Sequence, residues 1–294
     1  MARSGHCAPV LQMRGRSGQY GKRLKLKHGP PVAENYLKRR NKMGFYVYIL
    51  GAKDSEMDAI ESVLKAEGLP YGYALNGKGQ RVFPAEAYKF SSQSKGTIND
   101  AEEFFYIECA PVGFKADADH HNKGDRGFGL PAHQAVAASS LGQVCEHLGI
   151  EMTQEQRVVA AADHNLRAAY EGRVPGVSAE EVLALRGKEL AARYSTDIEG
   201  FAAGVYAAAE LLKNAPKILV GGEEVADVRE CGVQSFMIDA SLLSGIPAIG
   251  RTDARQPEKV FLSAPGQVVE HAKEIEGPTW ALVDPAREFA TGIQ

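Results

Sequence analysis

Cysteine is scarce in this sequence, with four among 294 residues. Cys7, Cys109, Cys145 and Cys231 lie far apart, and no two of them form a Cys-x-x-Cys pair. Disulfide frameworks and structural zinc sites use paired or regularly spaced cysteines. We therefore expect neither, and we interpret the four residues as isolated reduced thiols.

Long apolar runs are also absent. No stretch approaches the ~18 to 20 apolar residues that cross a bilayer, and the N-terminus lacks the apolar segment of a secretory signal. We therefore expect a soluble, cytoplasmic protein without membrane partners. The sequence has no internal repeat. At 294 residues and 44% hydrophobic composition it can bury one large core or two moderate ones, and we expect two.

Charge is distributed unevenly along the chain. The formal net charge is −3, but residues 1–42 contain 11 of the 34 Lys and Arg residues and only one of the 37 acids, Glu34. We expect this basic segment to be disordered in isolation and to serve as a nucleic-acid-binding tail or a targeting extension. The alternative is that translation begins at Met43, directly before the first expected strand.

From Met43 onward the pattern predicts an α/β fold. Continuous apolar runs at 45–50 and 104–107 are typical of strands buried in a parallel sheet. Further strands or extended pieces and helices are indicated by alternation, capping residues and helical spacing. We expect strands at 71–75, 81–83, 217–220, 225–228, 235–238, 247–249 and 259–262, and helices with the acids of 54–58 at the start of the first, over 135–148, after the Thr153 cap, and over 179–193 and 197–213. Capping boxes are expected at Ser178 and Thr196.

The order of these elements predicts two domains after the basic segment. Strands alternate with helices in the first part, whereas short strands separated by glycine-containing turns dominate the second. We place a parallel-sheet α/β domain at 43–195 and a smaller α+β domain, with its linking helix, at 196–294.

Asp119-His120-His121 is the most informative stretch, because an acid and two histidines follow an apolar segment. In an open α/β sheet, ligands bind at the carboxyl ends of the strands. Other acids lie where strands end or within the following helices: Asp54, Glu56, Asp58, Glu108 and Asp163. Carboxylates with one or two imidazoles suit Mn²⁺ or Mg²⁺, and two such ions roughly 3.5–4 Å apart would assist a phosphoryl displacement.

Each of these residues taken alone has another interpretation. The acids of 54–58 favour the dipole at a helix N-terminus. Glu108 could be a surface acid, His120 and His121 a hydrogen-bonded loop pair, and Asp163 with His164 a local polar cluster. The joint pattern is what indicates a metal site.

These motifs resemble the DHH phosphoesterase superfamily over about residues 45–170. Asp119-His120-His121 looks like the naming motif, and Glu56-Met57-Asp58-Ala59-Ile60-Glu61-Ser62 resembles the first motif. Glu108 and Asp163 stand where the second- and fourth-motif aspartates would be, and 138–142 resembles the family's Ala-Ser-Ser turn. The resemblance implies a DHH-like domain holding two manganese ions on motif carboxylates and His120, with His121 facing the phosphate.

The sequence also departs from that pattern. Ala52 stands where the first motif has a histidine, and Glu56 and Glu108 replace aspartates. Either the site is re-spaced, with Asp54 in place of the histidine, or it does not hold two metals in the usual way. In the second domain Gly221-Gly222-Glu223-Glu224 lacks the histidine of the Gly-Gly-Gly-His signature. The segment 284–292 resembles the tail of that signature, and its Arg287 could bind a phosphate or form a surface ion pair.

The leading hypothesis is therefore a divalent-metal phosphoesterase acting on a nucleotide, a short oligonucleotide or a related small phosphate ester, with two ions of Mn²⁺ or Mg²⁺, or one. The predicted metal ligands are Asp54, Glu56, Asp58, Glu108, Asp119, His120 and Asp163, the catalytic residues His121 and Asp119, and the substrate contacts Arg287 and His164. The alternatives are a non-hydrolytic DHH-like nucleotide-binding protein and a nucleic-acid-associated protein that binds through residues 1–42. The oligomeric state is not indicated.

Overall fold

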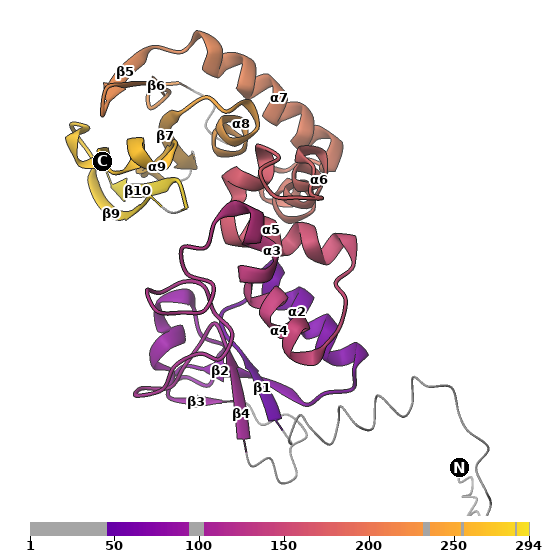
Figure 1. Cartoon of the computed structure of the whole chain (residues 1–294). Helices are drawn as coiled ribbons and strands as arrows, with labels where there is room; N and C mark the ends of the chain where they lie inside the picture. Colours follow the sequence, from indigo (N-terminus) through magenta and orange to yellow (C-terminus); the bar gives the residue numbers. More distant parts are fainter. Residues whose placement is uncertain (1–45, 94–102, 232–235, 254–255, 286, 294) are drawn as a thin grey trace, which may run out of the picture. The chain divides into compact units, whose positions relative to one another are not determined.

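The computed structural model describes residues 46–93, 103–231, 236–253, 256–285 and 287–293 (Figure 1). By its contacts the chain divides into Met1–Gly44 and Phe45–Gln294. The predictions for residues 1–42 lie outside the described residues. No helix in the described ranges has the length and hydropathy of a membrane-spanning segment.

The first sheet is built around β1, which lies between two parallel neighbours. The strands in the described part of this sheet, in the order β3-β2-β1-β4, are β3 (Ser92–Gln93), β2 (Tyr71–Leu75), β1 (Tyr46–Leu50) and β4 (Glu103–Ile107). β2 and β4 both pair with β1 in parallel, and β3 pairs with β2 antiparallel. The predicted strands at 45–50, 71–75 and 104–107 are confirmed, and so is their parallel arrangement. Val47 to Leu50 are fully buried, as expected for a strand covered on both faces.

Different elements cover the two faces of this sheet. On one face the ring of His147, from α4 (Ser140–Leu148), lies 4.5 Å from the ring of Phe105, and α4 packs against α2 (Ser55–Ala66) and α5 (Gln154–Tyr170). On the other face Val82, Ala87 and Phe90, within and around the 3₁₀ helix η1 (Pro84–Lys89), join the apolar side chains of β1. The carboxyl ends of β1 and β4 therefore lie at one edge of a layered α/β arrangement.

The helices mostly begin at the polar residues that the sequence marks as caps. In chain order they are α2 (Ser55–Ala66), α3 (Ala135–Ala138), α4 (Ser140–Leu148), α5 (Gln154–Tyr170), α6 (Ala179–Leu190), α7 (Ile198–Asn214), α8 (Met237–Ser244) and α9 (Gly266–Val269), with 3₁₀ helices η1 (Pro84–Lys89), η2 (Ala132–Gln134), η3 (Ala191–Tyr194) and η4 (Ala272–Glu274). Thr153 and Ser178 cap as predicted. The predicted box at Thr196 is wrong, because Asp197 caps α7 by accepting a hydrogen bond from the amide of Gly200.

The expected helix over 135–148 is broken at Ser139. Ser139 has extended backbone angles, and its hydroxyl accepts from the amide of Gly142 to start α4 afresh. A Cβ on Gly142 would overlap the carbonyl oxygen of Val136, so glycine permits the close approach of the two short helices. The apolar periodicity continued through this break and concealed it.

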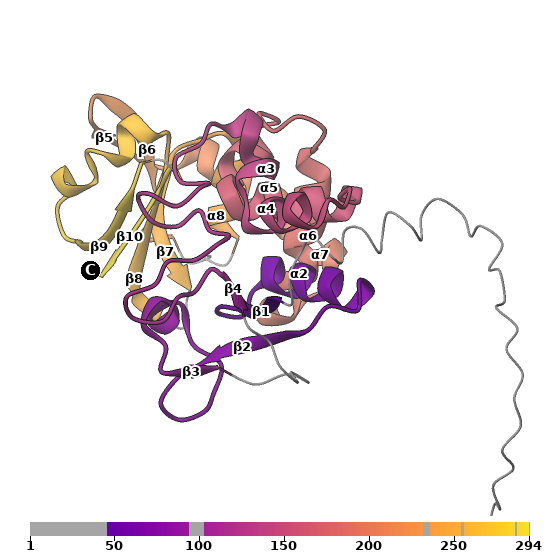
Figure 2. The same ribbon diagram turned by 60° about the horizontal axis from the view of Figure 1, so that its bottom comes forward.

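The second sheet is mixed. In the order β5-β6-β7-β8-β10-β9 its described strands are β5 (Lys217–Val220), β6 (Glu223–Asp227), β7 (Ala248–Asp253), β8 (Gln256–Ser263), β10 (Phe289–Ile293) and β9 (Thr279–Asp284). β6 and β7 are parallel and the other pairs antiparallel, and Figure 2 shows β7 to β10 side by side. β9 and β10 were not predicted. The predicted strand at 235–238 is wrong, because α8 begins at Met237.

One core cluster joins the helices to the second sheet. It contains buried side chains from α5, such as Tyr170, from α7, such as Phe201, and from β8, such as Phe261. Met237 and Leu242 of α8 belong to it as well, so a short apolar run that could have been a strand is a buried helix instead. The described chain is therefore mixed α/β, with parallel pairing in the first sheet and a separate mixed sheet, and this core crosses the expected boundary at 195/196.

Candidate metal centre

Glu108 lies at the carboxyl end of β4, where the backbone of β1 approaches closely. The amide of Gly51 donates to the carbonyl of Ile107 over 2.9 Å, and a Cβ on Gly51 would overlap the Glu108 carbonyl oxygen. Glu108 itself has a φ of 48°, in the left-handed region that residues other than glycine rarely occupy. Its side chain is buried and accepts a 2.8 Å hydrogen bond from the hydroxyl of Ser140.

The N-terminus of α2 separates its three acids. Asp54 is the N-cap and accepts from the amide of Met57, whereas Glu56 is fully buried and accepts from the amide of Leu141 over 2.9 Å. Asp58 is exposed and lies 3.8 Å from the ammonium of Lys53. Residues two apart lie on nearly opposite sides of a helix, so Glu56 and Asp58 cannot face one site. Asp58 therefore does not face the same side as Glu56, and its predicted role as a metal ligand stays a prediction.

Asp119 organises the turn that carries the two histidines. Its Oδ1 accepts from the amides of His120 and His121, at 2.7 and 3.0 Å, and lies 3.0 Å from Nδ1 of the His121 ring. Its Oδ2 accepts from the Tyr88 hydroxyl over 2.8 Å. Both oxygens thus have partners and orient the turn, and the predicted role of Asp119 as a metal ligand stays a prediction.

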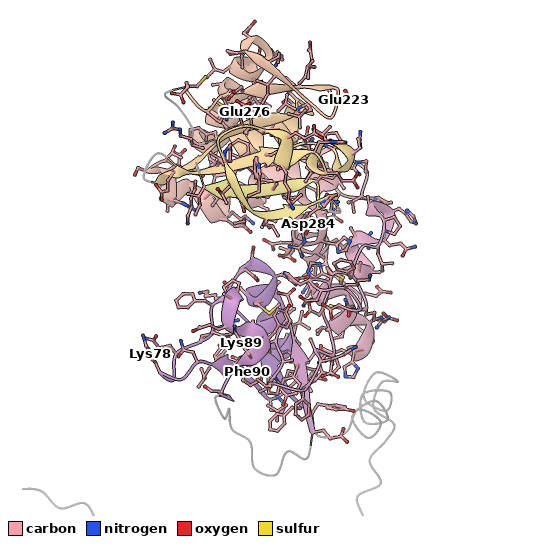
Figure 3. All side chains as sticks on the ribbon, turned by 90° about the vertical axis from the view of Figure 1, so that its left-hand side faces the viewer. Lys78, Lys89, Phe90, Glu223, Glu276 and Asp284 are labelled. Atoms are coloured by element: carbon pink, nitrogen blue, oxygen red, sulfur yellow. The ribbon has the colours of Figure 1, made fainter. Side chains whose placement is uncertain are left out.

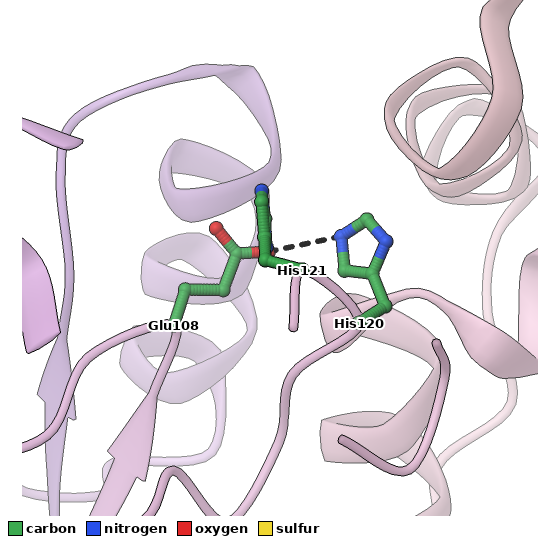
Figure 4. Close-up of side chains that lie close together, drawn as sticks. All are labelled: Glu108, His120 and His121. Carbon is green, nitrogen blue, oxygen red and sulfur yellow. Dashed lines mark hydrogen bonds and ion pairs between the residues drawn. The ribbon is translucent and has the colours of Figure 1, made fainter. Parts of the chain in front are cut away.

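His120 is the point at which the remaining acids meet. Its Nε2 lies 2.9 Å from Asp163 Oδ2, 3.2 Å from Glu108 Oε1 and 3.7 Å from Glu56 Oε2. Ligand atoms of these four residues all lie within 4.8 Å of one another, close enough to hold one metal ion. A second group, Glu108, His120 and His121, shares two of its members with the first (Figure 4).

Three carboxylate oxygens of the four-residue group compete for one imidazole nitrogen. His120 Nε2 carries at most one hydrogen and faces Asp163 Oδ2, Glu108 Oε1 and Glu56 Oε2, so it cannot serve as donor to all of them. A buried carboxylate oxygen without a donor is costly, and a cation would compensate it. The donor set therefore fits a divalent ion.

The electrostatics of the group show how strongly its members interact. Burial disfavours the charged imidazole, but the surrounding carboxylates of Asp163, Glu108 and Glu56 outweigh it and raise the pKa of His120 to about 12. Burial, and then the charge of Asp163, raise the pKa of Glu56 well above its ordinary value. For Asp163 the charged His120 ring outweighs burial and lowers the pKa to about 2. Without a cation, the positive charge of His120 partly balances the surrounding carboxylates.

Asp54 lies beside this group without joining it. More than a third of the residue is exposed, and it caps α2. Desolvation of the carboxyl, and then the charge of Glu108, raise the pKa of Asp54 to about 7. Asp163 and His121 also act on it electrostatically. Its predicted role as a replacement ligand therefore stays a prediction.

A pocket of about 270 Å³ adjoins His120. His120 and His164 line it together with Phe128, Leu130, Arg173 and Arg287. Arg173 pairs with Glu288. Nε of Arg287 lies 3.7 Å from Oδ2 of Asp284, a residue at the end of β9 that is labelled in Figure 3. Nη2 of Arg287 is buried without a hydrogen-bond partner in the described ranges. The charge of Arg287 reaches both His121 and His164.

His164 is buried, and both of its ring nitrogens have partners. Nδ1 lies 3.2 Å from Nδ1 of His120, and Nε2 lies 3.2 Å from the carbonyl oxygen of Leu130. Its predicted contact with a substrate stays a prediction, as does that of Arg287.

Several residues of the site were not found from the sequence. Tyr88, Gln143 and the carbonyl of Leu130 gave no local signal. The side chain of Gln143 forms two hydrogen bonds with the Asp119 backbone: it accepts from the Asp119 amide and donates to the Asp119 carbonyl. Ser140, which donates to Glu108, stands in the stretch that resembles the Ala-Ser-Ser turn, so that stretch was the one available signal.

Comparison with known proteins does not place this chain in a family. A scan against protein-family models, a search of curated proteins and a search of solved structures each find no match.

Proposed function

We propose that this chain is a divalent-metal-dependent phosphoesterase acting on a small phosphate ester, a nucleotide or a short oligonucleotide. The observation that carries the proposal is the convergence of Glu56, Glu108, His120 and Asp163, in which three carboxylates share one imidazole nitrogen. Asp119-His120-His121 and the order of its partner segments, which resemble the DHH phosphoesterases, support the same class of chemistry.

The donor set favours Mn²⁺ or Mg²⁺. Three carboxylates and one imidazole are hard or borderline ligands, and the nearby thiol of Cys109 instead donates to the carbonyl of Ile49. One ion is the simpler occupancy, because the second group of donors shares Glu108 and His120 with the first. A second ion would depend on Asp54 and His121 for donors of its own.

The protein side chains around this position have distinct roles in the proposed reaction. A divalent ion supplies Lewis acidity toward a phosphoryl oxygen and a lowered pKa for water. Asp119 holds the His121 ring through Nδ1, as an acid orients a histidine in other hydrolytic sites, and leaves Nε2 for the substrate. The interaction with Asp119 outweighs burial and raises the pKa of His121, which favours a role as proton donor to the leaving group.

The adjoining pocket suits the anionic part of such a substrate. Arg287 offers a guanidinium nitrogen without a partner in the described part of the chain, and Phe128 and Leu130 supply apolar surface. A guanidinium binds phosphate oxygens through paired hydrogen bonds.

The test is turnover of a panel of phosphomonoesters, phosphodiesters and short oligonucleotides by the purified full chain with Mn²⁺ or Mg²⁺. We expect activity that EDTA abolishes, and a loss of at least about a hundredfold for Glu56→Gln or Asp163→Asn. Asp58→Asn is the matched control and should retain activity, since Asp58 faces away. Absence of turnover together with absence of bound metal in the wild type would refute the proposal.

The altered first motif favours one alternative, a nucleotide-binding protein without hydrolytic activity. Ala52 offers no metal ligand where the DHH pattern has a histidine. Calorimetry distinguishes the two functions, because nucleotide binding that survives EDTA and yields no product favours the alternative. Binding of nucleic acid through residues 1–42 stays a prediction, tested by the affinity and its salt dependence after deletion of that segment.

A further inference from the structure

Two buried imidazoles and a backbone carbonyl form a continuous row behind the proposed metal position. His120 Nδ1 and His164 Nδ1 are 3.2 Å apart, and His164 Nε2 lies 3.2 Å from the Leu130 carbonyl oxygen. The two residues are 3% and 7% exposed, so water does not compete freely for these contacts. Each contact needs one hydrogen, and the chemistry of the groups determines where each hydrogen lies.

The carbonyl sets the direction of the row. A carbonyl oxygen only accepts, so the hydrogen between Leu130 and His164 must be on His164 Nε2. A neutral His164 then has a lone pair on Nδ1, which can only accept from the ring opposite. The hydrogen between the rings is therefore on His120 Nδ1, and a neutral His120 carries its lone pair on Nε2, the nitrogen that faces the three carboxylates.

We propose that His164 is a positioning residue that fixes His120 in the tautomer able to bind a cation through Nε2. This inference rests on the metal site of the proposed function. Histidine ligands commonly donate their second N–H to a carboxylate or a carbonyl. Here the acceptor is a neutral imidazole, and it adds no negative charge beside three carboxylates that a single divalent ion must already balance.

Two consecutive residues of α5, Asp163 and His164, contact the two ring nitrogens of His120. Asp163 lies at Nε2 of His120 and His164 at Nδ1. The helix is interrupted directly afterwards, at Asn165, whose φ and ψ of −153° and 92° are not helical. Asn165 then restarts the helix by accepting from the amide of Ala168 over 2.9 Å. This break allows successive side chains to meet one ring.

The test compares His164→Leu with His164→Asn in the full chain. The side-chain oxygen of Asn lies close to where Nδ1 of His lies, so His164→Asn keeps an acceptor for His120, whereas His164→Leu removes it. We expect the affinity for Mn²⁺, measured by electron paramagnetic resonance, to fall about 10–100-fold in His164→Leu and to recover largely in His164→Asn. His133→Leu, at an exposed histidine, is the control.

A spectroscopic measurement addresses the tautomer directly. Two-bond ¹⁵N–¹H correlations of ¹⁵N-histidine-labelled wild type with diamagnetic Zn²⁺ should show His120 protonated at Nδ1 and metal-bound at Nε2. The opposite tautomer would overturn the inference even if His164→Leu did not fold.

The possible failures are separable. If the wild type binds no Mn²⁺, the proposed metal site is refuted, and this inference with it. If the wild type binds Mn²⁺ and a folded His164→Leu binds it equally well, or if His164→Asn is no better than His164→Leu, only the role of His164 is refuted.

Discussion

At the scale of single residues, the acids of the site differ in the donors that they already have. Asp119 accepts from two amides and the Tyr88 hydroxyl and contacts the His121 ring, whereas Glu56 Oε2 and Asp163 Oδ2 share a single nitrogen, Nε2 of His120. A carboxylate that already accepts several hydrogen bonds gains less from a cation than one that shares a single donor. The hydrogen bonds therefore favour Glu56 and Asp163 over Asp119 as ligands of a cation.

Metal binding should release protons. Without a cation, His120 is protonated at neutral pH, because its pKa is raised to about 12. A cation that binds through Nε2 of His120 displaces its proton, so affinity should increase with pH by about tenfold per pH unit for each proton released. Calorimetry in buffers of different ionisation enthalpy counts the protons, and Asp58→Asn should behave as wild type. An affinity independent of pH would contradict protonation of His120 in the metal-free site.

Tyr88→Phe should impair the orientation of His121 without removing a ligand. The change deletes the hydroxyl that donates to Asp119 Oδ2, and the lost hydrogen bond should cost about 0.5–1.5 kcal/mol of stability. We expect kcat to fall about tenfold and the affinity for Mn²⁺ to stay within about twofold. Tyr206→Phe, at an exposed tyrosine, is the control, and a loss of Mn²⁺ affinity in Tyr88→Phe would show that Asp119 acts on the metal directly.

The sequence identified the four converging residues by type and order, but not their orientation. Glu56 and Asp58 carry the same functional group, so residue type does not distinguish them. Which of the two faces the protein interior depends on where α2 begins, and that position is set by the Asp54 cap. Glu108 adopts a left-handed backbone conformation, which the presence of a glutamate in the sequence does not predict. The partners of the Asp119 carboxylate come from η1, 31 residues away, and from its own turn.

At the scale of elements, the site depends on close backbone contacts that only glycine allows. Gly127 donates its amide to the carbonyl of Asp119, and a Cβ there would meet the Ala138 carbonyl oxygen and lie 2.6 Å from His120 Cβ. The loop after the histidines is thus held against the break between α3 and α4. Such contacts have no periodicity, which is why the turn, the break at Ser139 and the strands β9 and β10 were not predicted.

Gly127→Ala should therefore displace His120. Overpacking of this kind costs about 1–3 kcal/mol, and the shifted ring should weaken Mn²⁺ binding by at least about tenfold. Gly77→Ala is the control, since a Cβ at Gly77 meets no atom within 4 Å. Thermal unfolding and Mn²⁺ titration of both variants provide the comparison, and wild-type affinity in Gly127→Ala would show that the loop adapts.

At the scale of the whole Phe45–Gln294 unit, α5 connects the candidate metal centre to the second sheet. Arg167, 1% exposed, pairs with Glu171 over 3.1 Å and donates to the Ser263 hydroxyl of β8 over 2.7 Å. A buried guanidinium must keep such partners, so the helix and the strand depend on each other. Together with the shared core, this contact opposes independent unfolding of the two predicted domains.

Unfolding of the unit should consequently be a single transition. Trp280, the one tryptophan of the sequence, reports on β9, whereas far-UV circular dichroism reports mainly on the helices. We expect coincident urea transitions from the two probes. Two separated transitions would support the domain boundary that the sequence pattern indicated.

Ser263→Ala should lower the stability of the unit by about 1.5–3 kcal/mol, because it removes a hydrogen bond to a buried charged group. Ser62→Ala, on the exposed face of α2, should change stability by less than about 0.5 kcal/mol. Both values come from the urea midpoints, and equal midpoints for the two variants would show that Arg167 finds another partner.

The restricted orientation of the His120 ring should also affect the rate of metal binding. Asp163 and His164 hold its two nitrogens, and Gly127 packs at its base, so the ring cannot turn over without breaking contacts on both sides. A ligand that is already oriented does not have to rearrange when a cation arrives. The association rate of the metal should then be limited by loss of water from the ion and of protons from the site, and not by a conformational change of the chain.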